Sequence, residues 1–268
     1  MAQSIDMNEI VGNVSILFVC LDSLRYDVAK MEETSGGTPT FSQYGIWQKR
    51  QAPGNFTYPS HQAMFAGFLP VECSVKEMKQ REKLFFAEDI GMGRKRPEGA
   101  FQFQGTNWVE GLAVEGYDTY CIGGLSFFDG RSPLGTVMPS YFKRHYWHPS
   151  FGCKVKESTK YQVDTALRIL KKQKEQKPLF MYINVSALHY PCYFYVEGAK
   201  QDSVETQRAA LRYVDGEIKR LFDGFQKYGK TFCICCADHG TCFGEDGYWY
   251  HGFSHPLVNI VPYKHFFL

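Results

Sequence analysis

The 268-residue chain is 44% hydrophobic and 22% charged, which predicts an ordinary soluble globular core. Its formal net charge of +2 is too small to attract nucleic acid or an anionic membrane by electrostatics alone, so neither is expected as a partner. The polar N-terminus lacks the basic and apolar regions of a signal peptide, and the longest apolar run, residues 14–21, is too short to span a bilayer. We therefore expect a cytoplasmic protein without membrane insertion.

Nine cysteines are scattered along the chain, several of them inside apolar runs that are typical of strands. The "CICC" stretch at residues 233–236 resembles a metal knuckle, but no second Cys pair at zinc spacing accompanies it. We expect these residues to be buried, reduced cysteines that behave as small hydrophobic side chains. This cysteine usage favours a reducing compartment.

The first element in the chain is a continuous apolar run at residues 14–21, which predicts a buried parallel strand. The run ends at Asp22, and a helix is expected from about Ser23. The Gly, Ser and Pro content of residues 32–40 predicts a loop.

A second helix is predicted to start near Pro59, because proline suits the first helical turn. Thr57 would then lie just before this helix, where unpaired backbone N–H groups favour anions. Residues 91–99 predict a surface loop and residues 116–124 a second strand. Residues 125–155, rich in Gly, Pro and aromatic side chains, predict a long ordered loop of the kind that shapes pockets.

The second half of the chain alternates helices with strands. A helix is predicted over residues 158–177, and a strand over 178–191 runs into a loop at His189. The next helix has Asp202 and Glu205 at capping-box spacing. Three further features complete the pattern: a helix stop at Gly229, a strand at 231–237 and a last strand at 256–263.

This alternation predicts an α/β fold, with a mostly parallel central sheet and helices on both faces. No internal repeat or linker interrupts it, so we expect a single domain over residues 1–268. Ligands of such sheets bind beyond the carboxyl ends of the strands. Asp22, His189 and the Asp238-His239 pair all fall at the ends of strands that apolar runs alone predict.

Four of these side chains make a plausible divalent metal site: Asp22, Thr57, Asp238 and His239. Three oxygen ligands and one nitrogen suit zinc or manganese better than calcium. A metal on the Thr57 hydroxyl would lower its pKa and make it a nucleophile. The structural alternatives are that Asp22 caps a helix and that Thr57 is a capping or turn residue.

His189 and His251 remain outside this ligand set and could hold the anionic oxygens of a substrate or protonate a leaving group. A packed loop histidine is the structural alternative for His189. A second metal on these two histidines is also conceivable, with a further ligand from Glu245, Asp246 or His255. The other histidines, among them His61, are expected to be structural.

The order and spacing of these motifs resemble the alkaline phosphatase/sulfatase superfamily over nearly the whole chain. "ILFVCLDSLRYDVA" is similar to its first metal-ligand strand, "FTYPSH" to its nucleophile motif and "INVSALHYP" to its substrate-side H-x-P element. "ADHGTCFGEDGYWYHG" resembles the S-D-H-G-x-x-x-G-E-x-G-x-x-x-H-G motif of bacterial phosphoethanolamine transferases, and "DSL" resembles the lipoteichoic acid synthases. The resemblance implies an alkaline-phosphatase-like catalytic domain with a metal centre.

The chain also departs from the family's patterns. Formylglycine sulfatases need Cys or Ser where Thr57 stands, and they carry Asp where Ser23 stands and Asn where His239 stands. Two-metal phosphodiesterases have Asp where Val185 stands, which favours one ion over two here. The transferases carry transmembrane helices, whereas no apolar run in this sequence is long enough to span a bilayer. A membrane lipid is therefore not expected as the donor.

Our hypothesis is a metal-dependent hydrolase of a small-molecule phosphate ester, a mono- or diester, with Thr57 as the nucleophile and His189 and His251 assisting. The alternatives are a phospho-group transferase similar to the phosphoethanolamine transferases and a formylglycine-independent sulfate ester hydrolase. A metal-binding module with a catalytically silent site is the alternative that is not an enzyme.

Overall fold

A computed structural model describes residues 5–67, 106–173 and 177–268. The predicted loop at 91–99 lies outside these ranges. Nine helices and nine strands are present in the described residues, along with short 3-10 turns. The helices are α1 Met7–Ile10, α2 Tyr26–Ser35, α3 Pro39–Ser42, α4 Thr57–Ala66, α5 Trp108–Val114, α6 Pro133–Val137, α7 Ser158–Lys172, α8 Val204–Tyr228 and α9 Pro256–Asn259. The strands are β1 Ser15–Leu21, β2 Gln48–Gln51, β3 Asp118–Ile122, β4 Arg144–Tyr146, β5 Leu179–Val185, β6 Thr231–Cys236, β7 Cys242–Phe243, β8 Trp249–Tyr250 and β9 Ile260–Phe267.

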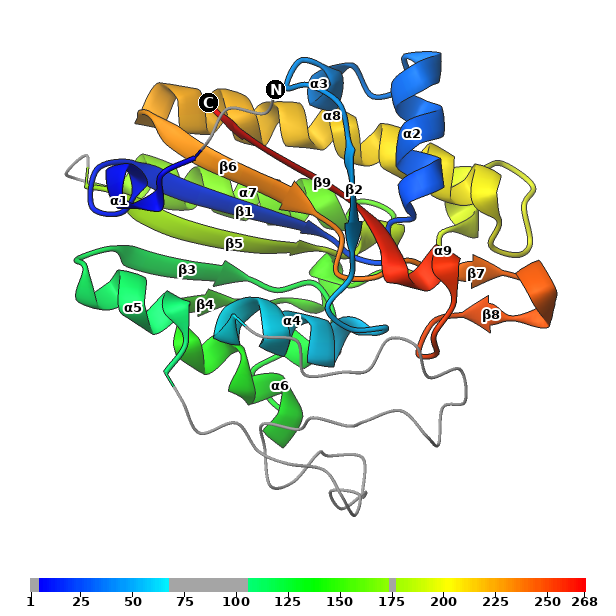
Figure 1. Ribbon diagram of the computed structural model, residues 1–268, viewed down its shortest axis with the longest axis horizontal. Coiled ribbons are helices and arrows are strands. Elements are labelled where there is room, and N and C mark those ends of the chain that lie inside the picture. The colour runs from blue at the N-terminus through cyan, green and yellow to red at the C-terminus, as the bar shows by residue number, and fades with distance from the viewer. Residues whose placement is uncertain (1–4, 68–105, 174–176) are drawn as a thin grey trace.

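Seven strands form one sheet in the order β2-β9-β6-β1-β5-β3-β4, in which β6, β1, β5, β3 and β4 run parallel. Strand β9 is antiparallel to β6, and β2 is antiparallel to β9. Helices α2, α3, α7 and α8 lie on one side of the sheet, and α4, α5 and α6 on the other (Figure 1). The predicted α/β fold with a mostly parallel sheet is confirmed.

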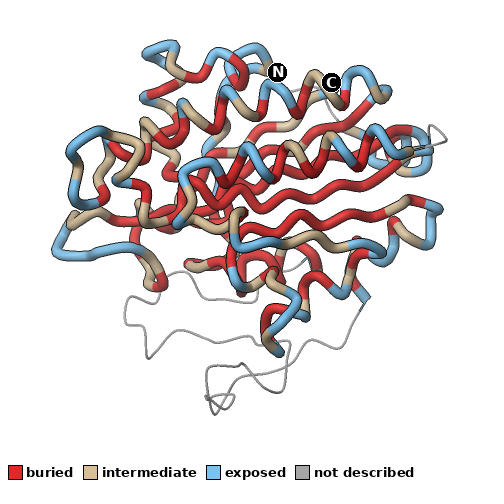
Figure 2. The backbone as a smooth tube through the Cα atoms, turned by 180° about the vertical axis from the view of Figure 1, so that it is seen from behind, coloured by how far each residue is buried: buried red, intermediate tan, exposed pale blue. Residues whose placement is uncertain are grey.

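The central strands are mostly apolar because both faces of the sheet are covered. Every residue of β1 and β5 is buried, and Figure 2 shows the buried backbone concentrated in the sheet. One hydrophobic cluster includes Leu17 and Val19 of β1 with Leu211 and Phe222 of α8. A second cluster, on the opposite face, contains Phe18 of β1. No helix in the described part of the chain is long and apolar enough to cross a membrane.

Several boundaries differ from the sequence-based expectations. Helix α2 begins at Tyr26 instead of near Ser23, because Ser23 has a positive φ of 65° that interrupts helical geometry. Helix α4 begins at Thr57, so Thr57 is its first residue and does not precede it. The predicted strand at 256–263 is divided, because His255 and Pro256 start the short helix α9 before β9 begins at Ile260.

The ends of two further helices and the content of the long loop also differ from the sequence-based expectations. The predicted helix over 158–177 ends at Lys172. The capping box of α8 is formed by Ser203 and Thr206, one position later than the Asp202–Glu205 pair, because a hydroxyl at Ser203 reaches the Thr206 N–H. The stretch 125–155 contains α6 and β4. Strands β2 and β4 were not predicted, because they are polar edge strands.

Candidate metal centre

Strands β1 and β6 are neighbours in the sheet, so their carboxyl ends bring Asp22 and Asp238 together. The ligand-type atoms of Asp22, Asp238 and His239 all lie within 4.8 Å of one another, and all three side chains are fully buried. Thr57, at the start of α4, completes the group: its Oγ1 lies 3.3 Å from His239 Nε2. The structure therefore brings together all four predicted metal ligands.

Asp22 is held by two side-chain hydrogen bonds. Its Oδ2 accepts a bond of 2.9 Å from Asn184 Nδ2, and its Oδ1 accepts one of 3.0 Å from Ser23 Oγ. Burial, and then the neighbouring Asp238 carboxylate, raise the pKa of Asp22 above its usual value. Asn184 and Ser23 were not predicted as parts of the site.

Asp238 uses its two oxygens differently. Oδ1 accepts backbone hydrogen bonds from Ser23 (3.1 Å) and His239 (3.0 Å), and the positive φ of Ser23 belongs to the turn that presents its N–H. Oδ2 is buried and accepts no hydrogen bond from any of the described residues. Burial raises the pKa of Asp238 to about 7. A buried carboxylate oxygen without a donor is a position where a cation fits.

His239 is oriented as a neutral ligand. Its Nδ1 donates to the Gly240 carbonyl at 2.8 Å, so the lone pair of Nε2 faces Thr57 Oγ1, Asp238 Oδ2 (3.4 Å) and Asp22 Oδ1 (3.9 Å). Burial lowers the pKa of His239 to about 4, which keeps the imidazole neutral. Gly240 is required by packing, because a Cβ there would lie 2.0 Å from the Leu257 carbonyl oxygen.

His61 is hydrogen-bonded to Thr57, although only a structural role was expected for it. Its Nδ1 donates to the Thr57 carbonyl at 2.7 Å, and its Nε2 accepts from the Tyr182 hydroxyl. Burial lowers its pKa to about 4. Cys20, His61 and Asp238 form a second group with ligand-type atoms in close range, but both nitrogens of His61 are already hydrogen-bonded and burial keeps Cys20 a protonated thiol. The set that includes Asp22 and His239 is therefore the better metal site.

His189 and His251 lie at the open side of Thr57. All three residues line one cavity of about 660 Å³. The ring centroids of His189 and His251 are 5.2 Å apart, and those of His239 and His251 are 4.2 Å apart. His189 Nδ1 donates to the Tyr190 carbonyl at 2.6 Å, which leaves Nε2 available to a ligand.

The conceivable second metal lacks a third ligand in the described ranges. No group of three metal-ligating side chains there includes His189 or His251. Glu245 forms an ion pair with Arg25, and Asp246 lies 3.1 Å from His255 Nε2. Both carboxylates that were candidate ligands of a second ion therefore already have partners.

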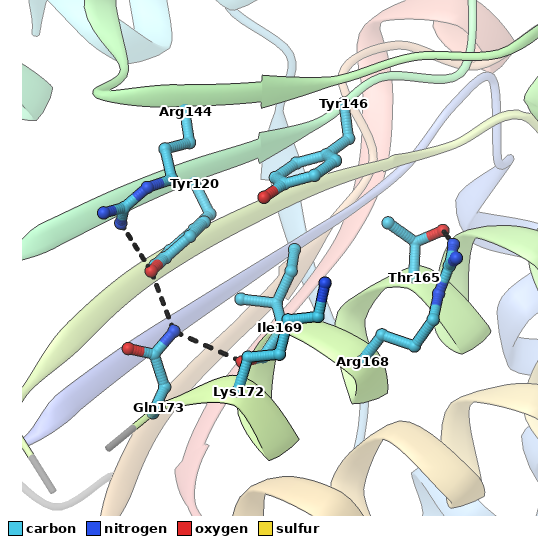
Figure 3. Close-up of a pocket in the computed structure, with 8 residues that line it drawn as sticks. All are labelled: Tyr120, Arg144, Tyr146, Thr165, Arg168, Ile169, Lys172 and Gln173. Carbon is cyan, nitrogen blue, oxygen red and sulfur yellow. Dashed lines mark hydrogen bonds between the residues drawn. The ribbon is translucent and has the colours of Figure 1, made fainter. Parts of the chain in front are cut away.

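Another hollow, of about 370 Å³, lies between α7 and the β3–β4 edge of the sheet (Figure 3). Its lining includes Tyr120, Arg144 and Gln173, which are joined by hydrogen bonds to the Tyr120 hydroxyl. None of the predicted catalytic or metal residues lines it. The cavity at Thr57 is therefore the candidate active site.

Comparisons with known proteins identify a matching family model and similar folds. The family model described as Sulfatase matches residues 15–258, a range that contains every predicted site residue. A search of the curated proteins finds no match.

Solved structures share the fold at low sequence identity. The periplasmic domain of phosphoethanolamine transferase EptC from Campylobacter jejuni has a TM-score of 0.60 and 13% identity, and the match covers 95% of this chain and 80% of that one. The lipoteichoic acid synthase LtaP from Listeria monocytogenes has a TM-score of 0.64 and 11% identity, with coverage of 98% and 69%. The zinc complex of EptC from Escherichia coli has a TM-score of 0.60 and 10% identity, with coverage of 93% and 71%.

Proposed function

The chain belongs to the sulfatase family of the alkaline phosphatase/sulfatase-like superfamily, and from this premise we propose that it hydrolyses a small-molecule phosphate ester with Thr57 as the nucleophile. The observation that carries the proposal is the position of Thr57. Its Oγ1 lies beside His239 Nε2 on one side, and the residue lines the 660 Å³ cavity on the other. One hydroxyl thus lies between the metal ligands and the space for a substrate.

Asp22, Thr57, Asp238 and His239 would hold one divalent ion, with zinc or manganese the best match to three oxygens and one nitrogen. The family is generally metal-dependent, and the zinc complex of a structural neighbour supports zinc. When bound, the ion would supply positive charge that lowers the pKa of the Thr57 hydroxyl and offsets the charge of the transferred group.

In the first step, Thr57 Oγ forms a bond to phosphorus while the bond from phosphorus to the ester oxygen breaks. The hydroxyl proton of Thr57 passes to water. The leaving alcohol takes a proton from the imidazolium form of His189 or His251, which lie on the open side of Thr57. The N-terminus of α4, where Thr57 lies, would direct the positive end of the helix dipole at the phosphoryl oxygens.

In the second step, water attacks the phosphothreonine and releases inorganic phosphate. The imidazole that gave up its proton takes one from this water, and Thr57 recovers a proton as its oxygen leaves. His61 keeps the backbone of Thr57 in place through the bond to its carbonyl. A second alcohol in place of water would make the same site a transferase, as the names of the structural neighbours suggest.

Sulfate ester hydrolysis is the second candidate, because the family model is that of the sulfatases. Thr57 argues against it, since formylglycine is made from Cys or Ser and Thr57 cannot supply it. We therefore place phosphate ahead of sulfate.

The test compares aryl phosphate, aryl phosphodiester and aryl sulfate substrates, using wild type and the Thr57→Ser and Thr57→Ala variants with metal content measured on each. We expect phosphate ester turnover by wild type, partial turnover by Thr57→Ser and none by Thr57→Ala. Asn13→Ala, on the exposed surface, is the matched control. Unchanged turnover by Thr57→Ala would exclude Thr57 as the nucleophile. Faster turnover of the aryl sulfate would show that sulfate esters, and not phosphate esters, are the preferred substrates.

A further inference from the structure

The cavity beside Thr57 is larger than a phosphoryl group requires. Its volume of about 660 Å³ falls inside the range of roughly 300–1,000 Å³ that is typical of sites for whole small molecules. Thr57, His189 and His251 occupy the part beside the metal ligands. The remaining walls therefore face the organic part of the ester.

Three of those walls are aromatic and half-buried: Phe127, Trp147 and Tyr190. The guanidinium of Arg131, which does not line the cavity, lies 4.9 Å from the centroid of the Trp147 ring. This cation–π contact helps to orient the Trp147 ring. Tyr190 packs against the rings of His189 (4.3 Å between centroids) and Tyr250 (4.2 Å). Preorganised flat surfaces of this kind bind planar or cyclic groups.

The charge of the cavity has one sign. Lys154 is exposed and is the only Lys or Arg among the described lining residues, none of which is a carboxylate. Cys153, next to it, is a neutral thiol because burial raises its pKa to about 11. A cation at the rim of a cavity that also binds a phosphoester favours a second negative charge on the ligand.

We propose that Lys154 binds a second anionic group of the substrate, and that the organic part of the ester is a planar or cyclic group that carries this charge. The inference rests on the proposed phosphoester hydrolysis at Thr57 and adds the substrate class to it. It also means that an ammonium-bearing ester, such as a phosphoethanolamine ester, is a poor substrate here. Lys154 repels the ammonium group, and no described carboxylate in the cavity compensates.

The experiment uses a matched pair of esters, 4-carboxyphenyl phosphate and 4-carbamoylphenyl phosphate, which differ in charge and hardly in shape. We expect metal-loaded wild type to prefer the carboxylate in kcat/KM by about fivefold, the size of one charge pair at a partly exposed site. Lys154→Gln should remove this preference by slowing the carboxylate alone. Lys156→Gln, an exposed lysine two residues away that does not line the cavity, should keep it.

Binding gives a second readout that needs no turnover. Isothermal titration with the phosphonate analogues of the same two compounds should show the same preference, decreasing as salt screens the pair. Equal binding of both phosphonates by wild type, or an equal loss of both in Lys154→Gln, would overturn the role of Lys154. A preference for O-phosphoethanolamine would overturn the anionic class. Loss of turnover with the binding preference intact would count against the proposed function and leave the Lys154 inference standing.

Discussion

Asp238→Asn should stabilise the metal-free protein while it abolishes metal binding. In the metal-free chain, the pKa of Asp238 is raised from 3.8 to about 7 because its carboxylate is fully buried. An acid whose pKa is raised in the folded state lowers the free energy of unfolding once the pH rises above its pKa in the unfolded state. The loss of stability is complete when the pH exceeds its pKa in the folded state. The cost therefore grows between about pH 4 and pH 7, and it amounts to about 4 kcal/mol above that window.

The variant keeps the local hydrogen bonds. Its amide oxygen can still accept from the N–H groups of Ser23 and His239, and its amide nitrogen takes the place of Oδ2, 3.4 Å from the acceptor His239 Nε2. We therefore expect the metal-free variant to exceed wild type in the free energy of unfolding at pH 8, by up to about 4 kcal/mol, and to match it near pH 4. The buried neutral His239 makes the same contribution to the free energy of unfolding of both proteins, so this contribution cancels in the difference between them.

Urea denaturation of chelator-treated protein at both pH values measures this difference. A parallel series with zinc should cancel the advantage of the variant, because an ion at 1,000 times its dissociation constant adds about 4 kcal/mol to the free energy of unfolding of wild type alone. A metal-free variant that is less stable than wild type at pH 8 would contradict a destabilising role of the buried Asp238 carboxylate. It would mean that Asp238 Oδ2 is already satisfied without a cation.

Three more substitutions test the surroundings of the site. Asn184→Leu removes the bond to Asp22 Oδ2 and should weaken metal affinity by about 10–100-fold by titration calorimetry, whereas unchanged affinity would exclude Asn184 from ligand orientation. Ser203→Ala removes the α8 cap and should cost about 1 kcal/mol in chemical denaturation with metal affinity unchanged; a cost near zero would contradict the capping geometry. Gly240→Ala puts a Cβ 2.0 Å from the Leu257 oxygen and should lower stability by more than about 2 kcal/mol in the same assay, and a neutral result would show that this turn adapts.

The sequence predicted the parts of the fold where burial leaves a pattern. Strands β1 and β5 are buried on both faces, so their sequences are mostly apolar, and they end at the residues leading to Asp22 and His189. The edge strands β2 and β4, "QKRQ" and "RHY", were missed because their side chains are exposed or half-buried and carry no apolar signal.

The proximity of Asp22 and Asp238 could be predicted because both carboxylates directly follow buried strands, whose carboxyl ends meet at one edge of the sheet. The residues that hydrogen-bond to these carboxylates could not be predicted. Asn184 belongs to β5 and Ser23 to a turn, and neither residue type at such a place distinguishes a hydrogen-bond donor to a ligand from an ordinary polar residue. His61 was assigned a structural role, since one helical histidine carries no sign that it faces Thr57 and Tyr182. These contacts depend on the three-dimensional arrangement of α4, β1 and β5.

The central claim is that Thr57 carries the transferred group. Mass spectrometry of enzyme quenched in acid during turnover of an aryl phosphate tests it directly. We expect one phosphoryl group on the peptide that contains Thr57, at high occupancy when water attack is slow, and none in Thr57→Ala. A phosphoryl group on another residue, or continued turnover by Thr57→Ala, would contradict it.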